Sequence, residues 1–386
     1  MGRFEDALAQ PGLGAIAEIK RRSPSAGDLR PGADPAEIAP AYADAGAAAI
    51  SVLVDERFGG TWDDLRAARS ATAAPLLAKG FFSTAEHLRT AKEAGADAAL
   101  LLLRDLDDTQ VAALMAVGAE LGLDTLVEAH DAEELDRGIA LGARVLGVNA
   151  RDLATFAIDR RSQLELVARI PADRIAIAES GIVTRAQGAA AELAGADAIL
   201  VGSTLMRAPD PAAKLAELIS RPLVKVCGLT REEDVAVAVE SGADLVGFVL
   251  VPESPRAADT VLDVPDGVLS VAVWVGKAGE SSADLDQVHT VEEGKVRGRE
   301  AAVLREGEEV ARLLDLPWEG TDPAHWAAAA AADGRVFLAG RLGPDNVRDA
   351  IAAVHPWAVD ASSSLESSPG IKDHEKVRRY VEAARS

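Results

Sequence analysis

The chain of 386 residues has one cysteine and no long uninterrupted apolar run. The single cysteine, Cys227, cannot form an internal disulfide, which is typical of proteins from a reducing compartment. No stretch approaches about 18 consecutive apolar residues, the length of a membrane-spanning helix. The first residues, MGRFEDALAQ, lack the apolar core of a signal peptide. These absences predict a cytoplasmic protein with no membrane partner.

Positive charge is scarce as well. The chain has 40 Lys and Arg against 62 Asp and Glu, a net charge of −22. Residues 1–220 contain 22 basic and 33 acidic side chains and residues 221–386 contain 18 and 29, so each part carries −11. Without a basic face the chain is not expected to bind nucleic acid, and an anionic membrane surface would repel it.

Patterns of metal ligands are also missing. The six histidines lie far apart in the sequence, and we expect most of them at the surface: His87, His130, His289, His325, His355 and His374. No cluster of His, Cys and Asp has the spacing of a metal site. We therefore expect neither a metal ion nor an organic cofactor.

One pattern recurs along the chain: a helical stretch, then Gly-Ala, then a short apolar run. It occurs at 43–53, 92–102, 139–149, 192–202 and 239–250. Each glycine stands where a helix end favours a left-handed residue, and each unalternating apolar run is typical of a strand buried on both faces. Strands and helices thus alternate at ~25 residues per unit, which predicts an α/β fold with a parallel sheet.

Two architectures fit this alternation: an open doubly wound sheet and a (β/α)8 barrel. The G-x-G-x-x-G fingerprint of a dinucleotide-binding sheet is missing. Polar residues instead follow many of the predicted strands, which favours a barrel because its rim collects all the strand ends. A new strand begins after Arg221-Pro222, where proline disfavours a continuing helix. The prediction is two tandem TIM barrels, at 1–220 and 221–386.

The second part is short for a barrel. Residues 286–316 show no helix-length apolar stripe, and AAVLR, EGEE and VARLLD within them are typical of strand, turn and strand. We therefore expect the second barrel to be compressed around 290–316, with one helix lost or replaced.

Charged and small polar residues end the strands of the first part. Glu18 and Lys20 occupy alternate positions of one strand, so both side chains face the same way. Each polar strand end taken alone fits a solvated surface. Together they predict acid–base chemistry on a phosphorylated sugar derivative, with phosphate held at the Gly-Ser turns. The other strand-end residues are Lys79, Glu128, Asn149, Arg151, Glu179, Ser180, Gly181, Gly202 and Ser203.

At this point the residues resemble a known family, indole-3-glycerol-phosphate synthase. The resemblance covers about 15–217 and rests on seven motifs in order: EIKRRSPS, AISVLVDERFGGTWDDL, LLAKGFF, LGLDTLVEAHD, GVNARDLATF, AESGI and ILVGSTLM. It implies ring closure and decarboxylation of 1-(2-carboxyphenylamino)-1-deoxyribulose 5-phosphate, followed by dehydration.

The same resemblance implies a role for each rim residue. Lys79 would be the general acid at the ketone, and Glu128 would handle proton transfer in the dehydration, with Lys20 and Glu18 completing the set. Glu179 would line the substrate site, Asn149 and Arg151 would meet the substrate carboxylate and hydroxyls, and Ser23 would face the anthranilate. The phosphate would be held by Ser180, Gly181, Gly202 and Ser203.

Two departures from the family stand out. Gly80 follows Lys79 where the family has Asp, so another acid must orient the lysine or activity must fall. The first predicted strand begins at about residue 15, whereas the family has a longer leading segment with a helix over the active-site mouth. Substrate closure is therefore expected to differ more than the chemistry.

The second part resembles phosphoribosylanthranilate isomerase. The resemblance rests on LVKVCGLTREEDV, VLVPESPR, DQVH, FLAGRLGPDNV and AVDASSSLESSPGIKDHEKV, and it covers 222–384. It implies an Amadori rearrangement with Cys227 as general base and Asp360 as general acid. Arg256 would contact an anionic group, and Gly340, Ser362 and Ser363 would cradle the phosphate. Cys227 alone would more often be a small buried hydrophobe.

As general base, Cys227 needs a lowered pKa, to which Lys225 would contribute. As general acid, Asp360 needs a raised pKa. The family's Gly-Gly in the phosphate turn is here Gly340-Arg341, and its Gln-Leu-His-Gly is Gln287-Val288-His289-Thr290.

Three hypotheses follow. The first is a bifunctional enzyme that catalyses two successive steps of tryptophan synthesis. It would act on phosphosugar-anthranilate substrates and work as a monomer. The second is a synthase whose C-terminal barrel is a non-catalytic stabilising module, favoured by the compressed segment and opposed by Cys227, Arg256 and Asp360. The third is a regulatory pair of phosphosugar-binding barrels, against which Lys79, Glu128 and Lys20 argue because binding alone needs no proton donor.

Overall fold

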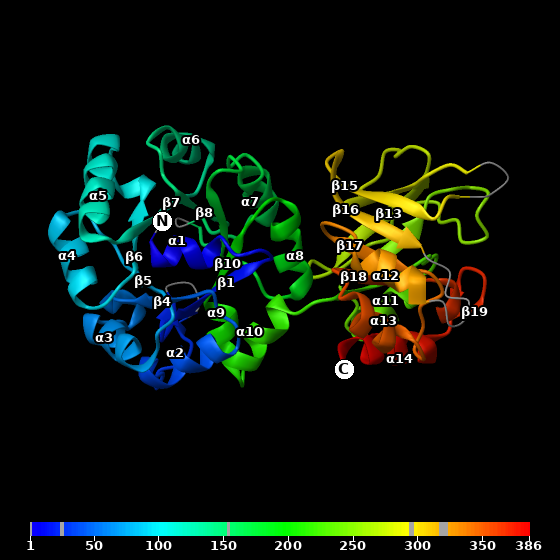
Figure 1. The fold of residues 1–386 in the computed structure, drawn as a ribbon, viewed down its shortest axis with the longest axis horizontal. Helices are drawn as coiled ribbons and strands as arrows, with labels where there is room; N and C mark the ends of the chain where they lie inside the picture. The colour runs from blue at the N-terminus through cyan, green and yellow to red at the C-terminus, as the bar shows by residue number, and fades with distance from the viewer. Residues whose placement is uncertain (1, 24–26, 153–154, 293–296, 316–322) are drawn as a thin grey trace. The chain divides into compact units, whose positions relative to one another are not determined.

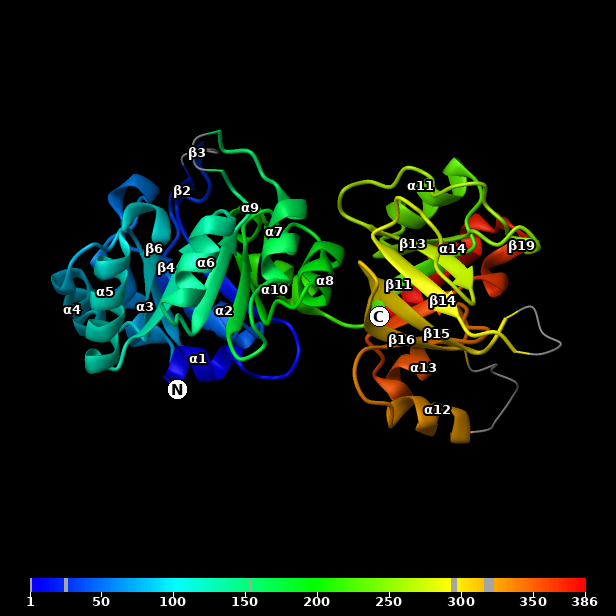
Figure 2. The ribbon, with the colours of Figure 1, turned by 90° about the horizontal axis from the view of Figure 1, so that it is seen from above.

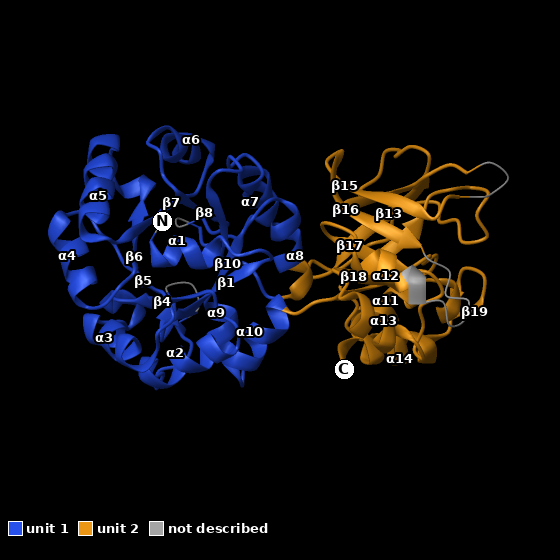
Figure 3. Ribbon diagram, in the orientation of Figure 1, with its two compact units in different colours: residues 1–183, 188–219 blue, residues 184–187, 220–386 orange. Residues whose placement is uncertain are grey.

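The computed structural model describes residues 2–23, 27–152, 155–292, 297–315 and 323–386 (Figure 1). The chain forms two compact units, Met1–Val183 with Gly188–Ile219, and Thr184–Gln187 with Ser220–Ser386 (Figure 3). Within the described residues, no helix is both long and apolar enough to span a membrane.

Eight parallel strands close into a barrel in the first unit, in the order β1-β10-β9-β8-β7-β6-β5-β4. Their side chains are buried along almost the whole of each strand, as expected for a sheet covered on both faces. The strands are β1 (Gly14–Ile19), β4 (Ala49–Leu53), β5 (Leu76–Lys79), β6 (Ala98–Leu102), β7 (Asp124–Ala129), β8 (Val145–Asn149), β9 (Ile175–Glu179) and β10 (Ala198–Val201).

Helices follow the strands and cover the outside of this barrel, while β2 (Arg22–Ser23) and β3 (Gly27–Asp28) form a short hairpin after β1 (Figure 1). The helices are α1 (Arg3–Leu8), α2 (Pro35–Asp44), α3 (Trp62–Ala71), α4 (Ala85–Glu93), α5 (Asp108–Leu121), α6 (Ala132–Ala140), α7 (Arg160–Val167), α8 (Arg185–Leu193), α9 (Ser203–Arg207) and α10 (Pro211–Ile219), with 3₁₀ turns η1 (Glu56–Phe58) and η2 (Leu103–Asp105). The predicted barrel is thereby confirmed.

The repeated Gly-Ala pattern has the same structural role in both units. All five of its glycines adopt positive φ at helix ends. In three copies an aspartate follows Gly-Ala, and its carboxylate accepts a hydrogen bond from the first N–H groups of the preceding strand. Asp97 accepts from Leu76 N at 2.9 Å and Asp197 from Ala176 N at 2.8 Å. The motif thus ends a helix and fixes the start of a neighbouring strand.

Helix α1 closes the N-terminal end of the first barrel. Phe4 and Leu8 are buried against the apolar side chains of the barrel interior. The Asp124 carboxylate at the start of β7 accepts hydrogen bonds from the N–H groups of Phe4 and Glu5, both at 3.1 Å. Figure 2 shows α1 at the opposite end of this barrel from the β2–β3 hairpin. The leading helix therefore lies away from the rim formed by the strand C-termini.

The second unit is also a closed eight-stranded barrel, in the order β11-β12-β13-β14-β15-β16-β17-β18. β15 runs antiparallel to both β14 and β16, and the other pairs are parallel. The strands are β11 (Leu223–Cys227), β12 (Leu245–Val249), β13 (Leu269–Val275), β14 (Leu285–His289), β15 (Glu300–Arg305), β16 (Glu308–Asp315), β17 (Val336–Ala339) and β18 (Ala358–Ala361).

The described residues of this barrel include four helices: α11 (Glu232–Glu240), α12 (Pro323–Ala330), α13 (Val347–Val354) and α14 (His374–Arg385). After β18 come the 3₁₀ turn η3 (Ser363–Leu365) and the small hairpin of β19 (Glu366–Ser368) and β20 (Ile371–Lys372). The predicted strand–turn–strand is confirmed by β15 and β16, which Glu306 and Gly307 join with positive φ, the geometry of a tight hairpin.

The loss of helices extends further than the sequence predicted. Residues 250–268 and 276–284 connect β12 to β13 and β13 to β14 without a helix. In the first of these connections the loop itself covers the barrel, because Ala258, Val261, Leu262, Val264 and Val268 pack against the apolar core. After the second connection β14 is buried only at alternate residues, so one face of that strand is only partly covered. A strand that does not need covering on both faces needs no packed crossover helix.

The aspartates of the Gly-Ala-Asp motif are expected to stabilise the first barrel through the strand N–H groups they accept. Replacing Asp197 by Ala leaves the Ala176 N–H without its partner, which we expect to cost about 1–3 kcal/mol of unfolding free energy. Asp197→Asn keeps an accepting oxygen and should cost clearly less. Urea unfolding of both variants measures the difference, and equal losses would contradict this role.

Candidate functional sites

Four ionisable side chains meet at the strand C-termini of the first barrel. The Lys79 ammonium lies 2.5 Å from Glu179 Oε2, 3.5 Å from Glu128 Oε2 and 3.7 Å from Glu18 Oε2. These residues come from β5, β9, β7 and β1, and barrel closure brings their ends to one rim. Carboxylates thus surround this lysine on three sides.

Burial and mutual charge set the protonation of this cluster. Burial acts to lower the pKa of Lys79, but Glu179, Glu128 and Glu18 outweigh it and raise the pKa well above the ordinary value. Burial acts to raise the pKa of Glu128, yet Lys79 and the neighbouring His130 lower it overall. For Glu179, burial and the charge of Glu128 raise the pKa to about 8 in spite of Lys79. One carboxylate thus stays ionised near neutral pH while another holds a proton.

Glu18 and Lys20 project from one face of the chain at the end of β1, as predicted. Lys20 Nζ lies 2.7 Å from Glu18 Oε1. The ammonium groups of Lys20 and Lys79 lower the pKa of Glu18 against the effect of burial. Gly202 makes room for this pair, because a Cβ at that position would overlap Glu18 Oε1 and lie 2.9 Å from Lys20 Nζ. Gly202 therefore supports the pair sterically.

Acids from other strands of the barrel take the place of the missing acid after Lys79. Glu179, Glu128 and Glu18 all contact the lysine ammonium from other strands. A Cβ at Gly80 would lie 2.9 Å from Phe82 Cε1, so a larger residue there would require Phe82 to move. The sequence left two outcomes open: another acid orients Lys79, or activity falls. This geometry favours the first.

The remaining predicted residues of the first site line the same rim. Asn149 Nδ2 donates to Glu128 Oε1 at 3.0 Å, while Arg151 N donates to Asn149 Oδ1 at 3.0 Å. Asn149 thus fixes a carboxylate in addition to any contact with substrate. Ser180 and Gly181 follow β9 with positive φ, Gly202 and Ser203 follow the adjacent β10, and Ser23 is buried in β2.

The sequence analysis expected most of the histidines at the surface and gave His130 no role, whereas the structure places His130 at the site. Its Nε2 lies 3.2 Å from Glu128 Oε1, and its Nδ1 lies 3.2 Å from Glu134 Oε2. Burial acts to lower its pKa, but the two carboxylates raise it to about 9. The sequence signal was the motif EAHD, where the histidine stands two residues after the expected catalytic glutamate.

The second barrel brings Lys225, Cys227 and Asp360 together on the adjacent strands β11 and β18. Lys225 is fully buried, and its ammonium donates to Asp360 Oδ2 at 2.9 Å and to Gln287 Oε1 at 2.8 Å. Burial raises the pKa of the Cys227 thiol, and Lys225 offsets only part of that effect. The expected lowering of the thiol pKa is therefore wrong for this structure, because desolvation outweighs the cation.

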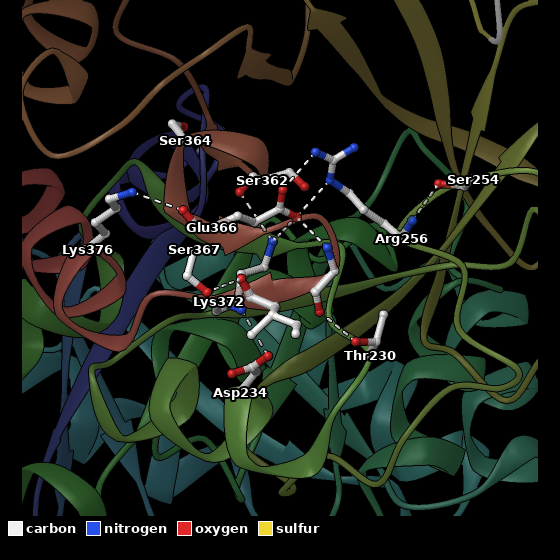
Figure 4. Close-up of polar contacts among 12 residues, drawn as sticks. Thr230, Asp234, Ser254, Arg256, Ser362, Ser364, Glu366, Ser367, Lys372 and Lys376 are labelled. Atoms are coloured by element: carbon white, nitrogen blue, oxygen red, sulfur yellow. Dashed lines mark hydrogen bonds and ion pairs between the residues drawn. The ribbon is translucent and has the colours of Figure 1, made fainter.

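Arg256 makes an ion pair that the sequence did not predict (Figure 4). Its Nε and Nη2 donate to Glu366 Oε1 and Oε2, each at 2.7 Å. The predicted phosphate turn, Ser362 and Ser363, directly precedes Glu366 along η3. Gly340, after β17, has φ of +113°, a value suited to glycine.

Further polar side chains lie inside this barrel. His289 is an exception to the expectation that most histidines lie at the surface: it is buried, and its Nε2 lies 2.8 Å from Gln287 Nε2. Burial and Arg297 lower its pKa to about 3, so it is neutral near pH 7. Asp315 ends β16, where it pairs with Arg297; an acid at a strand end was the available signal for it. Among the residues described, no group of three His, Cys, Asp or Glu could hold a metal ion.

Comparison with known proteins agrees with both barrels. Residues 2–218 match the family model of indole-3-glycerol phosphate synthase, and residues 324–383 match that of N-(5'phosphoribosyl)anthranilate (PRA) isomerase. The chain is 45% identical over 215 residues to an indole-3-glycerol phosphate synthase of Mycobacterium ulcerans (strain Agy99), covering 55% of this chain and 79% of the relative. It is 37% identical over 408 residues to the tryptophan biosynthesis protein TrpCF of Yersinia pestis, covering 96% and 84%.

Two closed barrels, each with lysines and carboxylates at one end, define a tandem TIM-barrel enzyme of the α/β class. The chain belongs to the family of bifunctional tryptophan-biosynthesis proteins that join an indole-3-glycerol phosphate synthase unit to a PRA isomerase unit. Because the similarity to TrpCF extends over both units, a synthase with a non-catalytic second barrel is not favoured.

The contact between His130 and Glu128 predicts a pH dependence of the synthase reaction. His130→Asn removes a cation that lowers the pKa of Glu128, so this pKa should rise. We expect the acidic limb of the kcat profile to move up by about one pH unit, as for loss of a charge within about 4–6 Å. The rate of indole-3-glycerol phosphate formation across a pH series measures the shift.

His87→Asn is the matched control, because His87 lies on α4 of the same barrel and its Nδ1 accepts from Ser83 N. It should leave the profile unchanged. An acidic limb that stays in place in His130→Asn, or moves equally in His87→Asn, would contradict the role of His130.

Proposed function

We propose that the chain catalyses two consecutive steps of tryptophan biosynthesis, each at the strand C-termini of one barrel. The second unit isomerises N-(5-phosphoribosyl)anthranilate to 1-(2-carboxyphenylamino)-1-deoxyribulose 5-phosphate. The first unit converts that product to indole-3-glycerol phosphate with loss of carbon dioxide and water. The observation that carries the proposal is the buried Lys79 ammonium among the carboxylates of Glu18, Glu128 and Glu179.

In the first unit, Lys79 gives a proton to the ketone oxygen while the ring carbon that bears the carboxylate bonds to the ketone carbon. Alkoxide charge develops there, so a fixed donor next to the oxygen lowers the barrier. The bond to the carboxylate then breaks and carbon dioxide leaves. Glu128 handles the proton transfer that accompanies loss of water, and Lys20 with Glu18 completes the set. Opposite shifts in the pKa of Glu128 and Glu179 support separate roles for the two acids.

In the second unit, an acid gives a proton to the ribose ring oxygen, the bond from that oxygen to C1 breaks, and an iminium forms. Cys227 removes the C2 proton, and the resulting enol tautomerises to the ketone. The resemblance to phosphoribosylanthranilate isomerase implies that this acid is Asp360. A second carboxylate, Asp315, ends β16 at the same end of the barrel, and this position makes it an alternative donor, although its ion pair with Arg297 favours the ionised form.

The substrates are anionic, although each unit is acidic overall. Local groups must therefore supply the binding. The basic side chains and main-chain N–H groups of the expected substrate sites would supply it. Those sites comprise Ser23, Asn149, Arg151, Glu179, Ser180, Gly181, Gly202 and Ser203 in the first unit, and Arg256, Gly340, Ser362 and Ser363 in the second. The proposal also places the protein in the cytoplasm as a monomer that acts on small molecules without a cofactor, nucleic acid or membrane partner.

Two variants separate the steps in the full chain. With phosphoribosylanthranilate as substrate, Cys227→Ala should leave the starting material unchanged, whereas Lys79→Ala should accumulate the ribulose intermediate. Each variant should lose about 10²–10⁴-fold in its own step, the usual contribution of a general acid or base. Fluorescence of the three anthranilate-derived compounds follows both steps, and undiminished isomerisation by Cys227→Ala would refute the assignment of the second barrel.

A further pair of variants assigns the acid of the isomerase. Asp360→Asn should abolish isomerisation while the synthase step with supplied ribulose compound continues at the wild-type rate. Asp315→Asn serves as its matched comparison, because both substitutions remove one acid from the same end of one barrel. Full isomerase activity in Asp360→Asn together with loss in Asp315→Asn would transfer the role to Asp315.

A further inference from the structure

Glu366 is the centre of a compact group of charges in the second unit (Figure 4). Its Oε1 accepts hydrogen bonds from Arg256 Nε at 2.7 Å and Lys372 Nζ at 3.1 Å, and its Oε2 accepts from Arg256 Nη2 at 2.7 Å. The Gly370 N–H also donates to Oε1, at 3.3 Å. The Glu366 side chain is only 5% exposed. Both oxygens are thus engaged, and the guanidinium is held in a bidentate fork.

Lys372 is the second cation of this group, and its side chain is 0% exposed. Its ammonium donates to Glu366 and to the carbonyl oxygen of Ser362 at 3.2 Å. Its main-chain N–H donates to the Asp234 carboxylate at 3.1 Å, which fixes β20 in place. Burial lowers the pKa of Lys372, and Glu366 opposes that shift. A fully buried lysine is retained only where its partners are well placed.

The group lies directly beside the expected base. Gly228 follows Cys227, and a Cβ on it would lie 2.8 Å from Ser362 Oγ, 3.0 Å from Arg256 Cδ and 3.6 Å from Lys372 Nζ. Both cations of the group, together with Ser362, therefore converge on the backbone next to the thiol. Two cations share one carboxylate there, so the group keeps a net positive charge in an acidic unit.

We propose that the Glu366–Lys372 ion pair is the positioning element of the isomerase site. Glu366 fixes the guanidinium of Arg256, and Lys372 fixes the carbonyl of Ser362. The pair thereby aligns the two groups expected to hold the two anionic ends of the substrate, its carboxylate and its phosphate. This role rests on the proposed function of the second unit.

Peptide geometry explains how Lys372 acts on the phosphate turn. In a trans peptide the C=O and the following N–H point in opposite directions. Because the Ser362 carbonyl is directed at Lys372, the Ser363 N–H is directed away from the lysine. Ser363 is the first residue of η3, whose first N–H groups have no partner inside the turn. Lys372 therefore sets the direction of a main-chain donor without touching the phosphate.

The geometry of the guanidinium explains how Glu366 acts on Arg256. Nε and Nη2 form one edge of the planar group, and Glu366 occupies that edge. The other edge consists of Nη1 and the second N–H of Nη2, and Nη1 has no hydrogen bond within the part of the chain that the structure describes. That edge matches the two oxygens of a carboxylate. Glu366 therefore orients the free edge while leaving it available.

The test is a double-mutant cycle on isomerisation of phosphoribosylanthranilate by the full chain, with Glu366→Gln, Arg256→Ala and the two combined. We expect Glu366→Gln alone to raise KM by about tenfold with a smaller change in kcat, an effect within the range of coupling between contacting residues. In the Arg256→Ala background the same change should alter KM by less than about twofold. Glu366 would then act through Arg256 alone.

Inhibition by small anions tests the two arms of the pair separately. Glu366→Gln should weaken competitive inhibition by anthranilate, and Lys372→Met should weaken inhibition by inorganic phosphate, each by about tenfold. Lys376→Met is the matched control, because Lys376 donates to the Glu366 main-chain oxygen at 2.9 Å and leaves the ion pair intact. It should change neither inhibition constant.

Thermal unfolding of each variant accompanies the kinetics. Should Glu366→Gln unfold, the cycle is measured with Glu366→Asp, which keeps the charge but withdraws the carboxylate from Arg256, and the same rise in KM is expected. An active wild-type chain in which Glu366→Gln costs as much in the Arg256→Ala background would refute the positioning role alone. A wild-type chain without isomerase activity would refute the proposed function, while anthranilate and phosphate binding would still test the pair.

Discussion

Closure of each sheet into a barrel is the constraint on which both sites depend. Closure turns the C-terminal ends of eight strands into one rim, so residues far apart in the chain meet there. Lys79 and Glu179 are 100 residues apart in the chain, and Lys79 Nζ lies 2.5 Å from Glu179 Oε2. Lys225 and Asp360 are 135 residues apart and meet in the same way. Neither pair could form on an open segment of the chain.

Burial at that rim makes the charges interdependent. A lysine inside a barrel is tolerated only with carboxylates around it, and carboxylates so close together cannot all be ionised with equal ease. Glu128, which also meets His130 and Asn149, stays ionised, whereas Glu179 holds its proton to a higher pH. The same principle works against Cys227, where desolvation outweighs the nearby cations of Lys225 and Lys372. The two barrels therefore differ in outcome. The acids around Lys79 raise its pKa in spite of burial, whereas the cations near Cys227 do not prevent burial from raising the pKa of the thiol.

The sequence predicted the features that depend on local chemistry. Positive φ at the Gly-Ala glycines, the strand-end positions of Glu18, Lys79 and Glu128, and the hairpin of β15 and β16 all follow from short motifs. It did not predict the ion pair of Arg256 with Glu366, which joins residues 110 apart, or the contact of His130 with Glu128. The Arg256–Glu366 pairing depends on how neighbouring loops pack, and residue type and spacing do not specify that. The motif EAHD, in contrast, placed His130 two residues from Glu128 and was an available signal.

The antiparallel strand β15 changes how one part of the second barrel's sheet is connected. Parallel neighbours are joined by a long crossover, and their pairing waits until distant parts of the chain meet. A two-residue turn instead joins β15 to β16, so their register is set between residues next to each other in sequence. This part of the sheet has low contact order and can form before the barrel closes. In this unit the part of the sheet that departs from the parallel pattern is therefore also the part whose strand pairing depends most on residues close together in sequence.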